Sequence, residues 1–407
     1  MDYYHAINLF MYEAYPIWKK DPNGFNYLQT RIFVIFQRKG PSTEIAKVII
    51  TLLKKIPAYL EEFQSRFDET PIPRVWRDLA LEQIQTTPNF FKTLLDAFKN
   101  AKSISESLID ELKNSFQAAE SVVLKHIEWV KTLPVDNDDF AWALGPEKLD
   151  ELFTLRKLPW DRETMFKKGK EVFNKLFKRM KKLAKEIDPT KSLTEVIEDV
   201  LKKDKIPTFQ EVLEFARSES ERAKRFILSH NLASFPQEKL VIVETPPHFV
   251  SIIPSAAYYD APYFHKEQPG IYMITPPQTE EDSIGNSYIL ISNAMVHEAY
   301  PGHHLDIASN NKYAPLARLL GFALETVEGW AHYCEEMMLQ QGFYKEPKNA
   351  ERYIIGNQLY RAMRVILDIQ LHCKQRTIED AVKMFMNILA MDETSAKAVA
   401  IYIQSRL

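Results

Sequence analysis

A short segment, Val296 to Leu305, concentrates residues that can bind a metal ion. It holds His297, Glu298, His303 and His304, although the chain has only 10 histidines among 407 residues. Two neutral imidazoles and one carboxylate, with a fourth position left for water, are typical ligands of a catalytic zinc. A glutamate beside the first histidine can then act as general base on that water. The segment therefore predicts a catalytic zinc site with Glu298 as the base.

The spacing of these histidines departs from the common zinc helix, in which two histidine ligands lie four residues apart. Pro301 stands four residues after His297, and Gly302 follows it. Proline lacks the amide donor and glycine relaxes the backbone, so the pair is expected to break or bulge the helix. In a regular helix His304 would return to the face of His297, but about 10.5 Å further along the axis. A two-residue bulge would instead place His303 as the second ligand, which we favour, with His304 as the alternative.

The third ligand is expected on a helix predicted over Pro315 to Gln340, which is apolar nearly all round and therefore expected to be buried. Its polar residues recur at helical spacing on one face. They are Glu325, Glu328, His332 and Glu335. A buried carboxylate is costly unless it is paired or bound to metal. We therefore predict Glu328 as the third ligand and His332 as a substrate contact; an acidic stripe facing solvent is the alternative.

A further helix, expected over about Ala350 to Cys373, carries a second polar stripe on an otherwise apolar sequence. The stripe consists of Arg361, Arg364, Asp368 and His372. Arginine offers a planar fork for a substrate carboxylate, and histidine can donate a hydrogen bond to a developing oxyanion. We expect Arg361 or Arg364 to hold a terminal carboxylate, and His372 or Tyr272 to stabilise the oxyanion. For either arginine alone, an internal ion pair with an aspartate is an equally good interpretation.

The composition is that of an ordinary soluble globular protein, with 45% hydrophobic and 26% charged residues. A net charge of -3 gives no overall attraction to nucleic acid or to an anionic membrane. Two cysteines, Cys334 and Cys373, are too few for a disulfide framework and fit a reducing compartment. The N-terminus lacks the features of a signal peptide, and no apolar run is long enough to span a membrane. We expect a cytoplasmic protein; its oligomeric state is not indicated.

Long amphipathic runs separated by prolines predict a mainly helical chain from the N-terminus to about Phe235. The expected helices are Ser42 to Phe67, with an interruption at Pro57, and Val75 to Lys99, Ser103 to Lys131, Arg162 to Ile187 and Thr208 to His230. In the helix that begins at Arg162, apolar residues recur every three to four positions and lysines occupy the opposite face. We expect this lysine face to be solvated.

The character of the sequence changes after Pro236, where β-branched and aromatic residues predict a small sheet just before the zinc segment. The expected strands are Leu240 to Glu244, His248 to Ile253 and Gly270 to Thr275. We therefore expect two regions, a helical one over 1–235 and a catalytic one over 236–407. The catalytic region would hold the sheet over 240–275, the metal-binding helices over 292–340 and a cleft-wall helix over 350–373.

Several motifs resemble the bacterial and archaeal family called domain of unknown function 885. They are His297 to His304, Glu328 to Tyr333, Arg361 to His372, Ala257 to Tyr259 and Pro269 to Tyr272. The resemblance covers about residues 130 to 405, and the family is grouped with gluzincin-type helical zinc metallopeptidases. These are similar in architecture to carboxypeptidase Taq, thimet oligopeptidase and angiotensin-converting enzyme. The resemblance implies a zincin-like, mainly α fold with a cleft between two helical halves. It also implies one zinc ion bound by His297, a later histidine and Glu328. Glu298 would be the general base. Within the matching segment we assign Tyr259 to the substrate site.

These features predict zinc-dependent hydrolysis of peptide bonds in short peptides, by a dipeptidase or a carboxypeptidase-like enzyme. The expected partner is a short peptide, not nucleic acid or a membrane. Family members usually continue beyond the position of Leu407 through a segment that contains proline and tyrosine. This difference motivates a second hypothesis, a helical binding or scaffold protein that keeps the site without hydrolysis. Hydrolysis of non-peptide amides or esters is a third, because it needs the same site.

Overall fold

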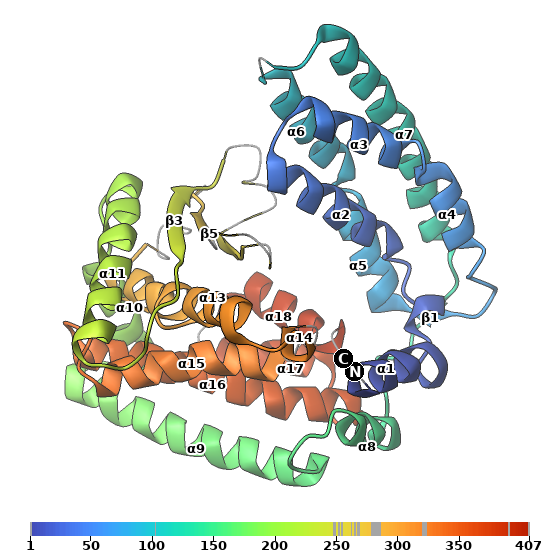
Figure 1. The fold of residues 1–407 in the computed structure, drawn as a ribbon. Coiled ribbons are helices and arrows are strands. Elements are labelled where there is room, and N and C mark those ends of the chain that lie inside the picture. Colours follow the sequence, from blue (N-terminus) through green and yellow to red (C-terminus); the bar gives the residue numbers. More distant parts are fainter. Residues whose placement is uncertain are drawn as a thin grey trace. The chain divides into compact units, whose positions relative to one another are not determined.

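The computed structural model describes residues 2–101, 103–246, 250, 253, 255–261, 263, 266, 269–277, 286–319, 324–389 and 391–405. The described chain is mainly helical with two small sheets, as the sequence predicts (Figure 1). It divides into two compact units. The N-terminal unit comprises His5–Lys157 and Leu371–Thr377, and the C-terminal unit comprises Met1–Tyr4, Leu158–Gln370 and Ile378–Leu407. Among the described residues, no helix combines the length and apolar character needed to cross a bilayer.

The N-terminal unit is built around one long helix, α7 (Glu106–Thr132), which contacts most of the shorter helices. The other elements are α2 (Gly24–Lys39), α3 (Thr43–Leu53), α4 (Ile56–Gln64), β1 (Ile72–Pro73), α5 (Arg74–Ile84), α6 (Thr87–Lys99), β2 (Val135–Asp136), α8 (Pro146–Leu155) and all of α1 (Asp2–Leu9) except its first three residues, which belong to the C-terminal unit. Aromatic rings fill its core, with Phe91 in contact with both Phe25 and Phe116. The helices expected in this part of the sequence are confirmed, with breaks after Leu53 and after Ile84.

Three helices precede the sheet in the C-terminal unit: α9 (Arg162–Ile187), α10 (Leu193–Lys203) and α11 (Phe209–Ser229). The apolar stripe of α9 packs through Met180 and Leu183 against α16 (Pro347–His372). Helix α11 packs through Ala223 and Ile227 against the buried side chains of the segment Val296–Leu305. Helices α9 and α11 thus pack against the site elements, α10 packs on α9, and all three belong to the C-terminal unit; the region boundary expected at Pro236 stays a prediction.

A three-stranded sheet follows α11, with β5 (Pro269–Ile274) between β3 (Lys239–Glu244) and β4 (Ala256–Tyr259). Strand β5 is parallel to β3 and antiparallel to β4. The strands expected over 240–244 and 270–275 are confirmed. The strand expected over 248–253 falls largely outside the described residues, and residues 250 and 253 are not in a strand. The third strand is β4, which places Tyr258 directly opposite Tyr272.

The histidine-rich segment Val296–Leu305 lies in a helix interrupted by a wide turn. Helix α12 (Tyr288–Ala294) runs into one π-helical turn (Met295–Ala299), the Tyr300–Pro301 peptide bond is cis, and α13 (His303–Tyr313) follows. The remaining elements are α14 (Leu316–Leu319), α15 (Leu324–Gln340), α16, α17 (Ile378–Leu389) and α18 (Glu393–Ser405). The predicted break at Pro301–Gly302 is therefore confirmed.

Helix α15 is not buried all round, which corrects the expectation from its apolar sequence. The side chain of Tyr333 is 58% exposed, Trp330 is 37% exposed, and Glu328 is also exposed. The opposite face is buried through Ala331, Cys334 and Met338. Apolar composition alone therefore misled the burial prediction, because α15 has only one face packed in the core.

Gly302 lies very close to the backbone carbonyl of His297. Its N–H donates to the carbonyl of Val296 at 3.0 Å. A Cβ at this position would lie 1.7 Å from the carbonyl oxygen of His297, far inside van der Waals contact. The backbone atoms of the π-helical turn cannot move aside as a flexible side chain would. Only glycine therefore fits this turn.

We expect Gly302→Ala to lower the free energy of unfolding by about 3 kcal/mol or more, because the added methyl group overpacks backbone atoms. Gly329→Ala is the matched control, since a Cβ there would meet no atom within 4 Å. Alanine at this helical position should be neutral or stabilising. Urea unfolding followed by circular dichroism measures both variants. Equal stability of the two would contradict the close approach at Gly302.

Candidate metal centre

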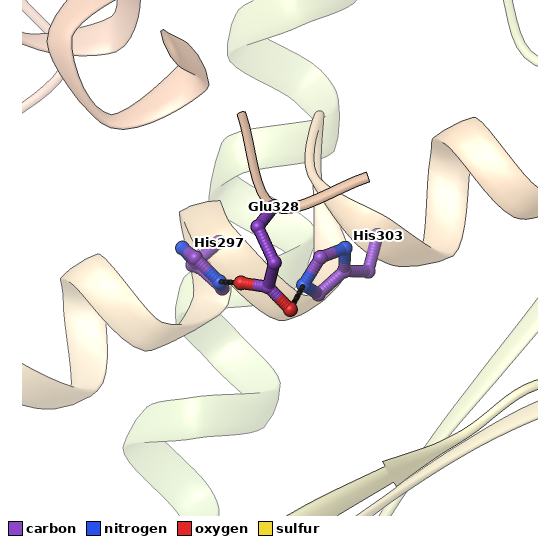
Figure 2. Close-up of side chains that lie close together, drawn as sticks. All are labelled: His297, His303 and Glu328. Atoms are coloured by element: carbon purple, nitrogen blue, oxygen red, sulfur yellow. Dashed lines mark ion pairs between the residues drawn. The ribbon is translucent and has the colours of Figure 1, made fainter. Parts of the chain in front are cut away.

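Three side chains from the two sides of the turn and from α15 converge on one point. They are His297, His303 and Glu328, whose ligand atoms all lie within 4.8 Å of one another. Figure 2 shows the Glu328 carboxylate between the two imidazole rings. One carboxylate oxygen lies 3.7 Å from Nε2 of His297, and the other lies 3.8 Å from Nε2 of His303. The bulge thus brings His303, and not His304, opposite His297.

The three side chains fit a zinc ion by donor type and by spacing. Around a tetrahedral zinc with bonds of about 2.0–2.1 Å, ligand atoms lie about 3.3 Å apart. The separations of 3.7 and 3.8 Å involve different oxygens of Glu328 and are longer than hydrogen bonds, and one ligand atom from each residue lies within 4.8 Å of the other two. The two rings are perpendicular, with centroids 4.8 Å apart, so both Nε2 atoms can point at one ion. Glu328 is half exposed, which leaves the cluster accessible from solvent.

Glu335 of α15 orients the first histidine of the cluster. Its buried Oε1 lies 2.7 Å from Nδ1 of His297 and 3.4 Å from Nδ1 of His332. Burial opposes ionisation of Glu335, but the hydrogen bond with His297 and the nearby His332 ring outweigh burial and lower its pKa to about 2. The ionised carboxylate can only accept, so His297 donates through Nδ1 and keeps Nε2 for the cluster. Metal-binding histidines are commonly held by such a carboxylate.

The charge balance of the cluster favours a dication. Burial disfavours a charged His297, but Glu328 and Glu335 outweigh burial and raise its pKa to about 9. Burial and the neighbouring His297 lower the pKa of His303 to about 4, so His303 is neutral at pH 7 and has a lone pair to offer. His297 lowers the pKa of Glu328. Ionised carboxylates therefore face the two rings, and a divalent cation would replace a proton there.

Glu298, the expected general base, lies beside the cluster and is partly buried. Burial raises the pKa of its carboxyl group, the charged His297 ring opposes that effect, and the negative charges of Glu328 and Glu335 add to it. A carboxylate whose pKa is raised toward neutrality is better suited to take and return a proton. The raised pKa is compatible with acid–base chemistry, and the role of Glu298 as general base stays a prediction.

His304 points away from the cluster into a buried polar network. Its Nε2 lies 2.7 Å from a carboxylate oxygen of Glu238, and its Nδ1 lies 2.9 Å from the Tyr258 hydroxyl. Glu238, whose side chain is 1% exposed, also accepts hydrogen bonds from Tyr300 and Lys224. Burial opposes ionisation of Glu238, but the hydrogen bonds of His304, Lys224 and Tyr300 lower its pKa to about 2. Both ring nitrogens of His304 are thus occupied, which leaves neither for the cluster.

The absence of a side chain at Gly270 of β5 leaves room for His304 and Tyr258. A Cβ at Gly270 of β5 would lie 2.4 Å from Nδ1 of His304 and 2.7 Å from the Tyr258 hydroxyl. Tyr258 and Tyr272 are directly opposite in the β4–β5 ladder and so share one sheet face. Tyr259 belongs to the other face, because adjacent strand residues alternate. Strand β4 therefore directs Tyr258 toward His304, which corrects the assignment of Tyr259 to this site.

The turn itself is held by α15. The indole Nε1 of Trp330 donates to the carbonyl of Pro301 at 2.9 Å. Trp330 stands two residues after Glu328, so the same helix that supplies the third candidate ligand also holds the turn between the two histidines. The position of Glu328 relative to both rings is therefore coupled to the geometry of the turn.

The other predicted site residues lie in three places. His332 and Arg361 line one cavity of the C-terminal unit and lie close to Glu335 and Glu328, respectively. Arg364 stacks over the ring of Tyr360 and is not among the residues that line this cavity. Tyr272 is buried in a core of α11, α12 and sheet side chains.

His372 belongs to the N-terminal unit, where it is fully buried. Its ring packs edge-on against Trp142, and the backbone N–H of Leu144 lies 3.4 Å from its Nδ1. Burial lowers the pKa of His372 to about 4. It is not a member of the cluster formed by His297, His303 and Glu328.

Three functional residues were missed or left without a role by the sequence reasoning. Glu335 shares a helix face with Glu328, which could have identified it as the partner of His297. Glu238 and Tyr258 carry no such signal, because they come from a loop and a strand far from His304 in sequence. Alternation along β4 alone could not decide between Tyr258 and Tyr259.

Comparison with known proteins gives a family match and two similar folds. Residues 9–403 match the family described as "Bacterial protein of unknown function (DUF885)", a wider span than the 130–405 expected. No curated protein matches the chain. A candidate lipoprotein of unknown function from Shewanella oneidensis is 21% identical, with a TM-score of 0.74 over 99% of this chain and 77% of that chain. A candidate lipoprotein from Colwellia psychrerythraea is 18% identical, with a TM-score of 0.74 over 91% of this chain and 68% of that chain. At these identities the likeness shows the fold alone.

The two adjacent histidines should differ in their effect on metal content. We expect His303→Ala to lose stoichiometric zinc, because it removes one of the three donors, while His304→Asn retains it. Elemental analysis after dialysis, with circular dichroism to confirm folding, measures this difference. Loss of zinc in folded His304→Asn together with retention in His303→Ala would contradict the assignment.

Glu238 should give the protein a pH-dependent stability. Its pKa in the folded chain, about 2, lies below the ordinary value of 4.5, so its contribution is complete above about pH 5 and is lost as the pH falls toward 2. The difference in unfolding free energy between wild type and Glu238→Gln should therefore shrink by about 2 kcal/mol between pH 6 and pH 3. Glu61→Gln, at an exposed position of α4, is the control. A difference that stays constant across this range would refute the role of the Glu238 charge.

Proposed function

The chain belongs to the family described as bacterial proteins of unknown function (DUF885), and we propose that it is a zinc-dependent hydrolase of peptide bonds in short peptides. One observation carries the proposal. His297, His303 and Glu328 converge within 4.8 Å of one another, and Glu298 lies next to the first of them. Three donors and a neighbouring carboxylate are the parts of a hydrolytic zinc site.

We assign metal binding, ring orientation and proton transfer to different residues of the site. His297, His303 and Glu328 would hold the ion, and Glu335 would keep the His297 ring in the required tautomer. Zinc, when bound, supplies Lewis acidity toward a carbonyl group and a water molecule. Glu298 would take a proton from the water that attacks the carbonyl carbon and return it to the amide nitrogen. The C–N bond then breaks to give a carboxylate and an amine.

The access to the cluster supports a small substrate. Glu328 is 50% exposed, whereas the side chains of His297 and His303 are 14% and 11% exposed. The cluster thus meets solvent mainly through its carboxylate side, next to the cavity that Arg361 and His332 line. A zincin-like architecture with a cleft between two helical halves, and a cytoplasmic location, stay predictions.

Glu298→Gln should abolish hydrolysis without loss of the metal, because it removes the proton acceptor but no ligand. We expect at least a 10²- to 10⁴-fold fall in kcat/KM on a mixed library of short peptides, with unchanged zinc content. Glu379→Gln, an exposed residue of α17, is the control. Cleavage of peptides by Glu298→Gln at the wild-type rate would refute the proposed role.

The same assay separates the alternative functions. Wild-type turnover of ester or non-peptide amide substrates without turnover of peptides would overturn the substrate class but keep the chemistry. Zinc-loaded protein that hydrolyses none of these substrates would favour the binding or scaffold protein.

A further inference from the structure

A cavity of about 660 Å³ opens beside the candidate metal centre, within the C-terminal unit. Residues of α9, α15 and α16 line it, and its volume is in the range of small-molecule sites. One of its lining residues connects it to the centre. His332 lies 3.4 Å from Glu335, which in turn holds the ring of His297.

One wall of this cavity is apolar and exposed. Trp160 is 44% exposed, Val172 is 48% exposed and Val365 is 37% exposed, and all three line it. Met165, Leu176 and Ala362 extend the same lining. Exposed apolar side chains that gather in one concave place indicate a binding surface, whereas single ones need no explanation. The wall therefore suits a bulky apolar group.

The cationic lining is available to an anion. Among the described residues, Arg361 has no ion-pair partner; its Nη1 donates only to the carbonyl of Asn357 on its own helix, at 3.3 Å. The ammonium groups of Lys168 and Lys175 come from α9, and Lys168 lies over the Trp160 ring. Arginine binds a carboxylate through two parallel hydrogen bonds, which makes it the residue suited to a terminal carboxylate.

The acidic lining does not cancel this preference. Two carboxylates, Glu171 and Glu336, line the cavity beside the three cations. Glu336 already accepts hydrogen bonds at 3.1 Å from Gln340 and from Gln358. Three cations against two carboxylates leave the lining with a formal charge of +1, which favours a negatively charged ligand over a cationic one.

We propose that this cavity binds the C-terminal residue of a peptide, with its carboxylate on Arg361 and a bulky apolar side chain against Trp160, Val172 and Val365. The inference rests on the proposed function for its substrate class, and it makes the enzyme a carboxypeptidase with an apolar preference. It also chooses between the two candidate arginines, because Arg361 lines the cavity and Arg364 does not.

Binding tests the cavity without any hydrolysis. N-acetyl-phenylalanine and its C-terminal amide are titrated by calorimetry into wild-type, Arg361→Gln, Val172→Asp and Lys167→Gln proteins. We expect wild type to bind the acid at least 10-fold more tightly than the amide, Arg361→Gln to lose that difference, and Val172→Asp to weaken both. Lys167 is exposed on α9 but does not line the cavity, so Lys167→Gln removes the same charge and should behave as wild type. Equal binding of acid and amide by wild type, or an unchanged preference in Arg361→Gln, would overturn the proposal.

Turnover separates this proposal from the proposed function. Peptides that end in phenylalanine should be cleaved at least 10-fold faster than those that end in glycine, and C-terminal amides should be poor substrates. Efficient cleavage of amidated peptides would overturn the cavity assignment and leave peptide hydrolysis standing. Acid-selective binding that depends on Arg361, with no peptide cleavage at all, would leave the cavity standing and overturn the proposed function.

Discussion

The close approach of Gly302 to the carbonyl of His297 is the constraint on which the candidate centre depends. Because Gly302 has no side chain, the π-helical turn Met295–Ala299 and the residues that follow it fit between helices α12 and α13. The turn rotates the second helix so that its first residue, His303, faces His297. A longer side chain would force the backbone apart and separate the two donors. Trp330 then ties the turn to the helix that carries Glu328, so one local geometry sets all three positions.

Two buried carboxylates give His297 and His304 different tasks. Glu335 holds His297 by Nδ1 and leaves Nε2 for the cluster, whereas Glu238 and Tyr258 occupy both nitrogens of His304. Each carboxylate is ionised because hydrogen-bond donors outweigh the cost of its burial. These hydrogen bonds fix the orientations of the two rings, while Oε2 of Glu335 and Nδ1 of His332 are buried without a hydrogen-bond partner among the described residues.

Accessibility separates the part of the centre that supports the fold from the part that faces a ligand. Glu335, Glu238 and His304 are almost fully buried, while Glu328 is half exposed and the cavity beside it has an apolar wall and an arginine. The exposed face of α15 and the cavity side of α16 thus carry the groups that can meet a substrate. The family match covers nearly the whole chain but names no activity, so the chemistry rests on these residues.

The sequence by itself determined the helical class, the sheet before Val296–Leu305, the break at Pro301–Gly302 and the pairing of His297 with Glu328 in one cluster. Composition and short-range periodicity control these features, so they can be read locally. Only the tertiary structure decided between His303 and His304 and brought Tyr258 and Glu238 into contact with His304. It also left one face of α15 exposed and placed His372 in the N-terminal unit. Each of these depends on which distant element packs against a given face, and contacts between residues far apart in the chain leave no periodic trace in one sequence.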